Sequence, residues 1–185
     1  AAIDALTSTQ VRGLTTSQVA AIVTTDLVAI ATAALGGLTS TQMVALTTDQ
    51  IRVLTDNQLT AMGSRQVVML TTEQISALQN SQVGVLNSLQ VAGLTTGQIV
   101  ALSTSQWANV TTTALTGLGF AQATAMETAD LRTLNTQQIA SLNSDALSGL
   151  STNQVGSLRT QQIAALTTQQ ILALSSQQLR ALGTE

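Results

Sequence analysis

The sequence predicts an all-α solenoid of very short capped helices, one for every eight residues. Three observations predict it: an unbroken eight-residue repeat, two apolar positions in each copy, and a polar pair with the spacing of a helix capping box. The repeat is clearest in residues 166–173, which read Leu-Thr-Thr-Gln-Gln-Ile-Leu-Ala. A second copy follows at once, and nearly the whole chain is this octad repeated.

The octad, numbered from its leucine, keeps one frame along the chain. Position 1 is apolar in every copy from Leu6 to Leu182, and position 6 is apolar from Val11 to Leu179. Position 3 is Ser, Thr, Asn or Asp in every copy except at Phe120, and position 5 is glutamine in most copies. The departures at position 5 are Asp26, Ala34, Ala114, Asp130 and Ala146. We therefore treat residues 1–185 as a single repeat domain.

A short helix in each copy follows from the polar pair at positions 2 and 5. In Thr167 and Gln170, for example, each side chain can satisfy a free amide at a helix start. The helix is expected to run from about position 3 or 4 to position 1 of the next copy. Position 6 and the next position 1, such as Ile171 and Leu174, then share one face.

Two other folds can be compared with this one. In a continuous helix, eight residues at about 100° each would turn the leucine stripe by roughly 80° per copy, so no face would stay apolar. A β-solenoid would mix Leu with Gln and Ile with Thr on each face of a strand, which a packed strand resists. The Val, Ile and Thr content still favours strands, so the β-solenoid remains the alternative.

Short helices must bury their apolar residues against neighbours, because a helix of this length is unstable alone. Copies that coil around a common apolar axis, with three or four octads per turn, would provide that burial. Glutamine at position 5 can then cap helices and bridge backbone groups within or between turns. The cap and ladder residues that we single out are Gln10, Gln18, Gln42, Gln50, Gln58, Gln74, Gln138, Gln162, Gln170 and Gln178.

Four irregular residues have specific interpretations. Trp107 stands at position 6, so we expect it to fill the core, whereas Phe120 replaces a cap residue and is the candidate interface residue. Asp26 and Asp130 replace glutamine and can still accept amide hydrogen bonds.

Composition argues against several functions. The chain has no Cys, His, Lys or Tyr, and charged residues make up 8% with a formal net charge of −3. Without the usual bases and metal ligands we expect no enzyme activity, cofactor or metal. The acidic balance argues against nucleic acid as a partner, and no 18-residue apolar run predicts membrane insertion. The chain begins at Ala1 and ends in mid-repeat at residues 183–185, so we expect a segment of a longer array.

The run of Leu-Thr-Thr-x-Gln-Ile-x-Ala copies resembles the tandem octads of very large proteobacterial surface or secreted proteins, which are described as adhesin-like or haem-utilisation proteins. This resemblance implies an extracellular or cell-surface location. Residues 14–22 are also similar to the first helix of the TAL-effector DNA-binding repeat, whose second helix and base-reading loop are absent here. Haem binding has no support in the residues, because His, Cys and Tyr are missing.

The function that we expect is a non-enzymatic extracellular scaffold, either a solenoid stalk or a subunit that self-associates end to end into a fibre. Incomplete apolar faces at the ends of a repeat array motivate the fibre. The alternative is a binding module that presents regular Ser and Thr ranks to a polysaccharide, a cell surface or ice.

Overall fold

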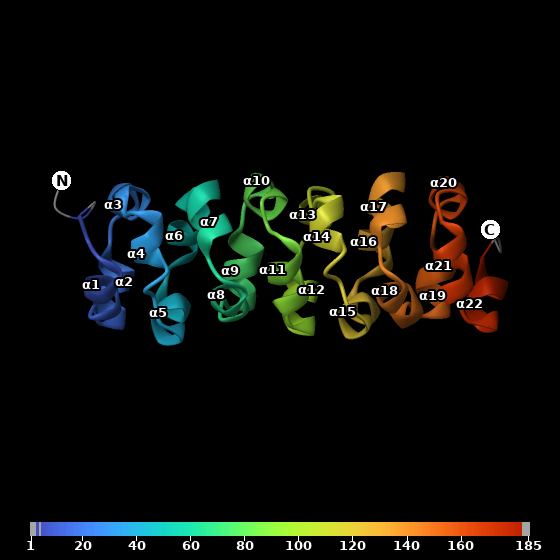
Figure 1. Cartoon of the computed structure of the whole chain (residues 1–185), viewed down its shortest axis with the longest axis horizontal. Helices are drawn as coiled ribbons and strands as arrows, with labels where there is room; N and C mark the ends of the chain where they lie inside the picture. Colours follow the sequence, from blue (N-terminus) through green and yellow to red (C-terminus); the bar gives the residue numbers. More distant parts are fainter. Residues whose placement is uncertain (1–2, 4, 183–185) are drawn as a thin grey trace.

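The computed structural model describes residues 3 and 5–182, which form a rod of 22 short α-helices with the two ends of the chain at opposite ends of the rod (Figure 1). Each octad contributes one helix, and no strand occurs within these described residues. The predicted all-α solenoid is therefore confirmed, and the β-solenoid is excluded. Residue 1 and residues 183–185, from which a longer array was expected, lie outside the described part.

The helices of the first half are α1 (Ser8–Arg12), α2 (Thr16–Ala21), α3 (Thr24–Ala29), α4 (Thr32–Leu35), α5 (Ser40–Ala45), α6 (Thr48–Val53), α7 (Asp56–Ala61), α8 (Ser64–Val68), α9 (Thr72–Ala77), α10 (Asn80–Gly84) and α11 (Ser88–Gly93). Those of the second half are α12 (Thr96–Ala101), α13 (Thr104–Trp107), α14 (Thr112–Leu115), α15 (Phe120–Ala125), α16 (Thr128–Thr133), α17 (Thr136–Ser141), α18 (Ser144–Gly149), α19 (Thr152–Gly156), α20 (Thr160–Ala164), α21 (Thr168–Ala173) and α22 (Ser176–Ala181).

Helix α5 shows why each octad forms one helix. The Thr39 side chain accepts a hydrogen bond from the Gln42 amide at 3.3 Å, and the Gln42 side chain accepts one from the Thr39 amide at 2.8 Å. This capping box satisfies two amides that have no partner inside the helix. The helix ends at Ala45, because Leu46 has extended backbone angles (φ −61°, ψ 135°). Position 1 is thus the corner between helices and lies beyond the helix end, by one residue in α5, rather than being the last helical residue as expected.

Successive turns of the solenoid contain between three and four octads. Helices pack against the third helix along the chain, as in α1 with α4 and α2 with α5. Hydrogen bonds between turns join residues 28 and 31 positions apart, which is three and a half octads and just under four. Along the lower edge of Figure 1, α5, α8, α12 and α15 accordingly follow one another in alternate steps of three and four helices. A helix therefore lies over the junction between two helices of the turn before it.

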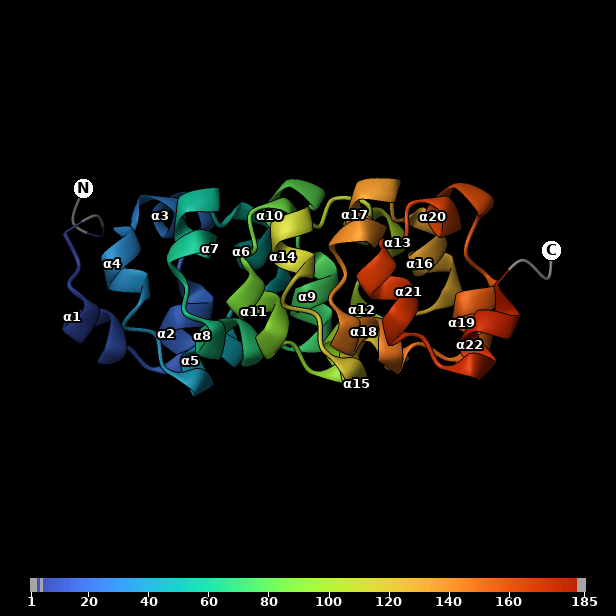
Figure 2. The same cartoon turned by 45° about the vertical axis from the view of Figure 1, so that its right-hand side comes forward.

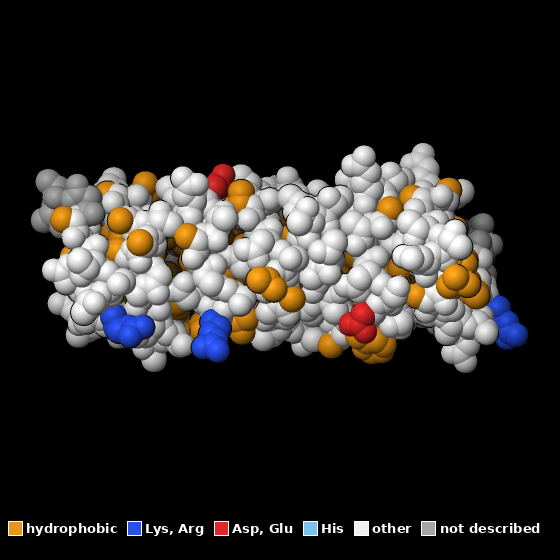
Figure 3. Space-filling model, in the orientation of Figure 1, with side chains coloured by type: hydrophobic (Ala, Val, Ile, Leu, Met, Phe, Trp, Pro, Cys, Tyr) orange, Lys and Arg blue, Asp and Glu red, His pale blue; other side chains and the backbone are white. Residues whose placement is uncertain are grey.

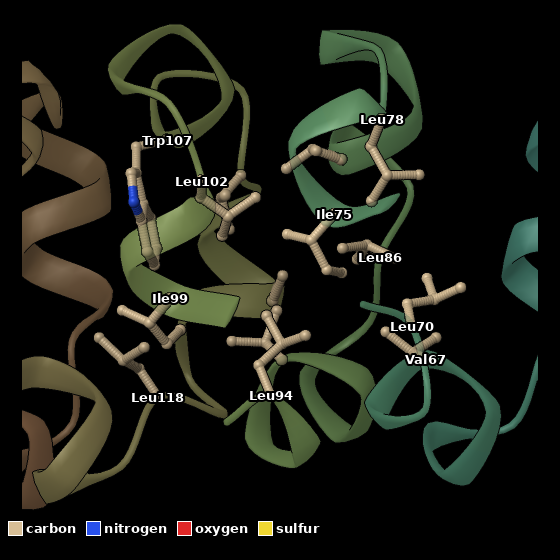
Figure 4. Packing of buried hydrophobic residues seen from close by; sticks show 14 of the residues in the cluster. Val67, Leu70, Ile75, Leu78, Leu86, Leu94, Ile99, Leu102, Trp107 and Leu118 are labelled. Atoms are coloured by element: carbon tan, nitrogen blue, oxygen red, sulfur yellow. The ribbon is translucent and has the colours of Figure 1, made fainter. Parts of the chain in front are cut away.

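Positions 6 and 1 form one continuous core along the rod. The turned view of Figure 2 shows the short helices following one another around the long axis of the rod. Ile75, Ile99 and Trp107 from position 6 point toward the axis among Leu94 and Leu102 from position 1 (Figure 4). Burying each such side chain stabilises the fold by about 1.5–3 kcal/mol. Short helices become stable here because neighbouring turns provide the burial that one helix lacks.

Trp107 fills the core as predicted, and none of its surface is exposed. Its indole Nε1 is the one buried side-chain nitrogen or oxygen without a hydrogen-bond partner among the described residues. An unsatisfied buried donor costs about 1–3 kcal/mol. The burial of the large ring offsets this cost.

Candidate functional site

The repeated polar feature of the molecule is the carboxamide of glutamine at position 5. In Gln42 the Oε1 atom accepts the Thr39 amide, while Nε2 donates to the carbonyl oxygens of Val11 at 2.9 Å and Leu14 at 2.7 Å. Those carbonyls belong to the end of α1 and to the corner that follows it. One side chain therefore caps the start of its own helix and the end of a helix on the turn before.

This arrangement recurs along the rod as a ladder. In every member Nε2 donates to the carbonyl oxygens 31 and 28 residues earlier, at 2.7–3.4 Å. The members are Gln42, Gln50, Gln58, Gln66, Gln74, Gln82, Gln90, Gln98, Gln106, Gln122, Gln138, Gln154, Gln162, Gln170 and Gln178. All but Gln66 are buried. A buried carboxamide is stable here because both its donors and its acceptor have partners.

The glutamines singled out from the sequence occupy two different settings. Gln10 and Gln18 lie in the first turn, where they are exposed and accept the amides of Thr7 and Thr15. The other eight belong to the ladder. Other ladder glutamines, such as Gln90 and Gln106, were not singled out from the sequence, although they too stand at position 5 and could have been found in the same way.

Three copies replace the glutamine by alanine and hold the previous turn differently. In each, position 8 is glycine, and a Cβ atom on that glycine would overlap the backbone of the turn before. Gly117, for example, lies against the Ser88 carbonyl, and Gly149 lies against the Phe120 carbonyl. The pairs are Ala34 with Gly37, Ala114 with Gly117, and Ala146 with Gly149. Close backbone packing takes the place of the carboxamide bridge in these copies.

Asn143 adds a polar bridge to one of these copies. Its Oδ1 caps helix α18 by accepting the Ala146 amide at 2.8 Å, and its Nδ2 donates to the carbonyls of Thr116 and Leu118. A residue at position 2 thus does what position 5 does elsewhere. The sequence signal for this bridge is an asparagine at position 2 in a copy that has alanine at position 5.

The copy of residues 126–133 lacks the position-5 glutamine, and it has neither a glycine at position 8 nor an asparagine at position 2 to replace it. Glu127 stands at the N-cap and makes no side-chain cap hydrogen bond, while Asp130 stands at position 5 with only 3% of its surface exposed. Burial raises the pKa of Asp130 above its ordinary value of 3.8, and the nearby charge of Glu127 raises it further, whereas hydrogen bonding from the Thr104 hydroxyl acts against both.

Phe120 is exposed over 52% of its surface at the first residue of α15. Its amide donates to the Asp145 carboxylate at 3.0 Å, so the neighbouring turn satisfies a free amide of α15. The side chain remains available to solvent, and its role as an interface residue stays a prediction.

The surface between turns carries shallow polar grooves that repeat with the octad. One groove is lined by Thr167, Gln170 and Asn143, and the next by the residues eight positions later. Within the described residues, no group of three or more His, Cys, Asp or Glu could hold a metal ion. None of the described helices is long and apolar enough to cross a membrane.

Two regions of the chain match a known family of repeats. Residues 19–56 and 123–160 match the ALTTAQ repeat. The six letters of that name correspond to position 8 and positions 1–5 of the octad, as in Ala45-Leu46-Thr47-Thr48-Asp49-Gln50. In this chain those six positions include the corner, the N-cap and the ladder glutamine. No curated protein shows significant similarity to the chain.

Proposed function

We propose that the protein is a non-enzymatic structural scaffold, a rigid solenoid stalk that holds apart whatever lies at its two ends. The glutamine ladder carries this proposal. Each turn is fixed to the one before by buried hydrogen bonds and by a continuous core, so bending the rod would separate buried donors from their acceptors. Such an object transmits position and orientation over its whole length.

The surface supports a spacer more than a catalyst or a nucleic-acid binder. In Figure 3 most of the face is backbone or side chains that are neither charged nor apolar, and the few charged groups lie apart from one another. A surface without a concentrated basic patch gives no electrostatic attraction for phosphates. The octads resemble those of large proteobacterial surface proteins, so we place the stalk outside the cell or on its surface, in an adhesin-like protein.

The geometry favours a stalk over a flat binding face for ice or a regular polysaccharide. A flat rank of hydroxyls needs a whole number of copies per turn, so that equivalent residues stack above one another. Here the turn lies between three and four octads, and equivalent Ser and Thr side chains are displaced from one turn to the next. Assays of ice recrystallisation and of glycan binding are expected to be silent, and a signal in either would favour the binding module.

Small-angle scattering and electron microscopy of the purified chain test the stalk. We expect straight rods of one length, and a version with seven octads duplicated should be longer by two turns without becoming more flexible. Duplicating the octads of residues 38–93, where every copy has glutamine, keeps the ladder unbroken. Bent particles with a spread of lengths would contradict a rigid stalk.

The same samples distinguish a stalk from a fibre subunit. Sedimentation at increasing concentration is expected to give discrete monomeric rods if the chain acts as a spacer within a larger protein. Uniform fibres that retain helical circular dichroism would instead assign it to end-to-end assembly.

A further inference from the structure

The copy of residues 126–133 forms a junction with the previous turn that differs from every other described junction. The neighbouring copies hold the turn beneath them by a glutamine or by an alanine and glycine pair. Here position 5 is Asp130 and position 8 is Thr133. The junction has no carboxamide donor, and it has no glycine for close backbone packing.

The Glu127 amide and the Thr104 hydroxyl donate to the Asp130 carboxylate, but the carbonyls of the turn before that correspond to the partners of a ladder glutamine are acceptors only. The carbonyls 31 and 28 residues before it are those of Ile99 and Leu102, which correspond to the pairs that every ladder glutamine bonds. The Ile99 carbonyl accepts the Leu102 amide at 3.3 Å, a bond that the equivalent carbonyls make in addition to the glutamine bond. An ionised carboxylate cannot donate to either oxygen, whereas a protonated carboxyl can donate one hydrogen bond.

The charges around this carboxyl do not compensate it. Helix α16 packs against α13 and α19, and neither helix contains a charged residue, nor does α12, which carries Ile99. On its own copy the groups are Glu127, which repels the carboxylate, and Arg132, whose guanidinium donates to the Ser157 carbonyl. A buried carboxylate in such a setting favours its neutral form.

We propose that residues 126–133 form a proton-operated joint of the solenoid, in which a proton taken from solvent by Asp130 supplies the donor that glutamine supplies elsewhere. Acid tightens this joint and neutral pH loosens it. The turn between residues 99 and 130 is then the place where the stiffness of the rod responds to pH.

The direction of the pKa shift agrees with this geometry. The folded protein holds the pKa of Asp130 above 3.8, so the folded state binds the proton more tightly than the unfolded state. The stabilisation is fully present below 3.8 and is lost as the pH rises through the higher pKa of the folded protein.

The first experiment follows the Asp130 side-chain carboxyl carbon by NMR from pH 7 to pH 3 in the full chain. Asp130 should titrate above 3.8, and the amides of residues 99–104 should exchange more slowly with solvent once it is protonated. Titration of Asp130 at or below 3.8 would overturn the proposal.

Three variants test the donor and the charge separately by thermal unfolding across the same pH range. Asp130→Asn has the same size and a permanent donor, so its melting temperature at pH 7 should exceed that of the unaltered chain by about 2–4 °C, with no further gain in acid. Asp130→Ala has neither charge nor donor and should also lose the acid response, but melt below Asp130→Asn. Asp56→Asn, which alters an exposed aspartate on α7, is the control and should keep the acid response.

Two results would contradict the joint. An acid response that persists in Asp130→Ala would assign it to other carboxyls. A saturable rise in melting temperature with CaCl₂ or NaCl at pH 7 that Asp130→Asn removes would show that a cation, and not a proton, fills this place. We expect neither salt to act differently on the two proteins.

Discussion

The side-chain amide of Asn143 donates to the carbonyl oxygen of Leu118 on the previous turn, with 2.7 Å between the two atoms. It does so in a copy where position 5 is Ala146, so the bridge between turns starts from the N-cap. The donor that reaches the corner carbonyl can therefore come from either of two positions in the octad.

Replacing Asn143 by serine tests this bridge. Serine can still cap the Ala146 amide but cannot reach the Leu118 and Thr116 carbonyls, so we expect a loss of about 1–2 kcal/mol in the free energy of unfolding. Urea unfolding measures it. Asn135→Ser is the matched control, because Gln138 supplies the bridge in that copy and the loss should stay within about 0.5 kcal/mol.

Replacing Gln90 by glutamate tests the ladder itself. Gln90 is fully buried, and its Nε2 donates to the Leu59 and Met62 carbonyls. Glutamate keeps the shape but turns two donor contacts into repulsion, which should cost about 3 kcal/mol at pH 7 and less in acid, where the carboxyl is protonated. Gln18→Glu is the control: it is exposed and only caps its own helix, so stability should hardly change.

Gly149 tests close packing between turns. A Cβ atom there would overlap the Phe120 carbonyl oxygen, so Gly149→Ala should destabilise the fold by about 2 kcal/mol or more despite the higher helix propensity of alanine. Gly97 lies in α12 with its nearest prospective neighbour at 3.8 Å, and Gly97→Ala should stabilise by about 0.5–1 kcal/mol. Thermal unfolding measures the stability change in each variant, and equal changes in Gly149→Ala and Gly97→Ala would rule out the close contact.

Trp107 offers a spectroscopic test of the core. Because the ring is fully buried, its fluorescence should be blue-shifted and should move to longer wavelength on unfolding. Trp107→Phe removes the unsatisfied N–H and should cost less than about 1.5 kcal/mol, whereas Trp107→Ala leaves a cavity and should cost about 3–5 kcal/mol. Similar losses in the two variants would mean that ring volume matters little at this position.

Phe120 tests the predicted interface. Since the ring is half-exposed and its amide bond to Asp145 does not involve the side chain, Phe120→Ser should change stability by about 0.5 kcal/mol or less. Self-association measured by sedimentation equilibrium should weaken if the ring forms a contact between molecules. Leu172→Ser, at the most exposed large apolar residue described, is the control.

The sequence was sufficient to predict local structure because each octad contains its own start signal and its own apolar face. Thr39 and Gln42 are three residues apart, and their capping box requires nothing from the rest of the chain. The end of the helix at Ala45 was misplaced by one residue, since the turn at Leu46 depends on how that side chain enters the core.

The spacing between turns could not be predicted, because no longer period in the variable positions records it. The partners of Gln42, Val11 and Leu14, follow only from the number of copies per turn, which the packing of the whole core decides. The pairing of Ala114 with Gly117 was visible in the sequence, but its meaning depends on Ser88 lying beneath the glycine.

The fractional number of octads per turn determines how such a rod can change its length. Adding or removing one octad leaves the capping boxes and the core pattern intact, but it rotates everything beyond that point by roughly 100° about the axis. Seven octads restore the original direction after two turns. A domain carried at the end of the rod would therefore face a new side after most changes in repeat number, so the copy number determines both how far it reaches and which way it points.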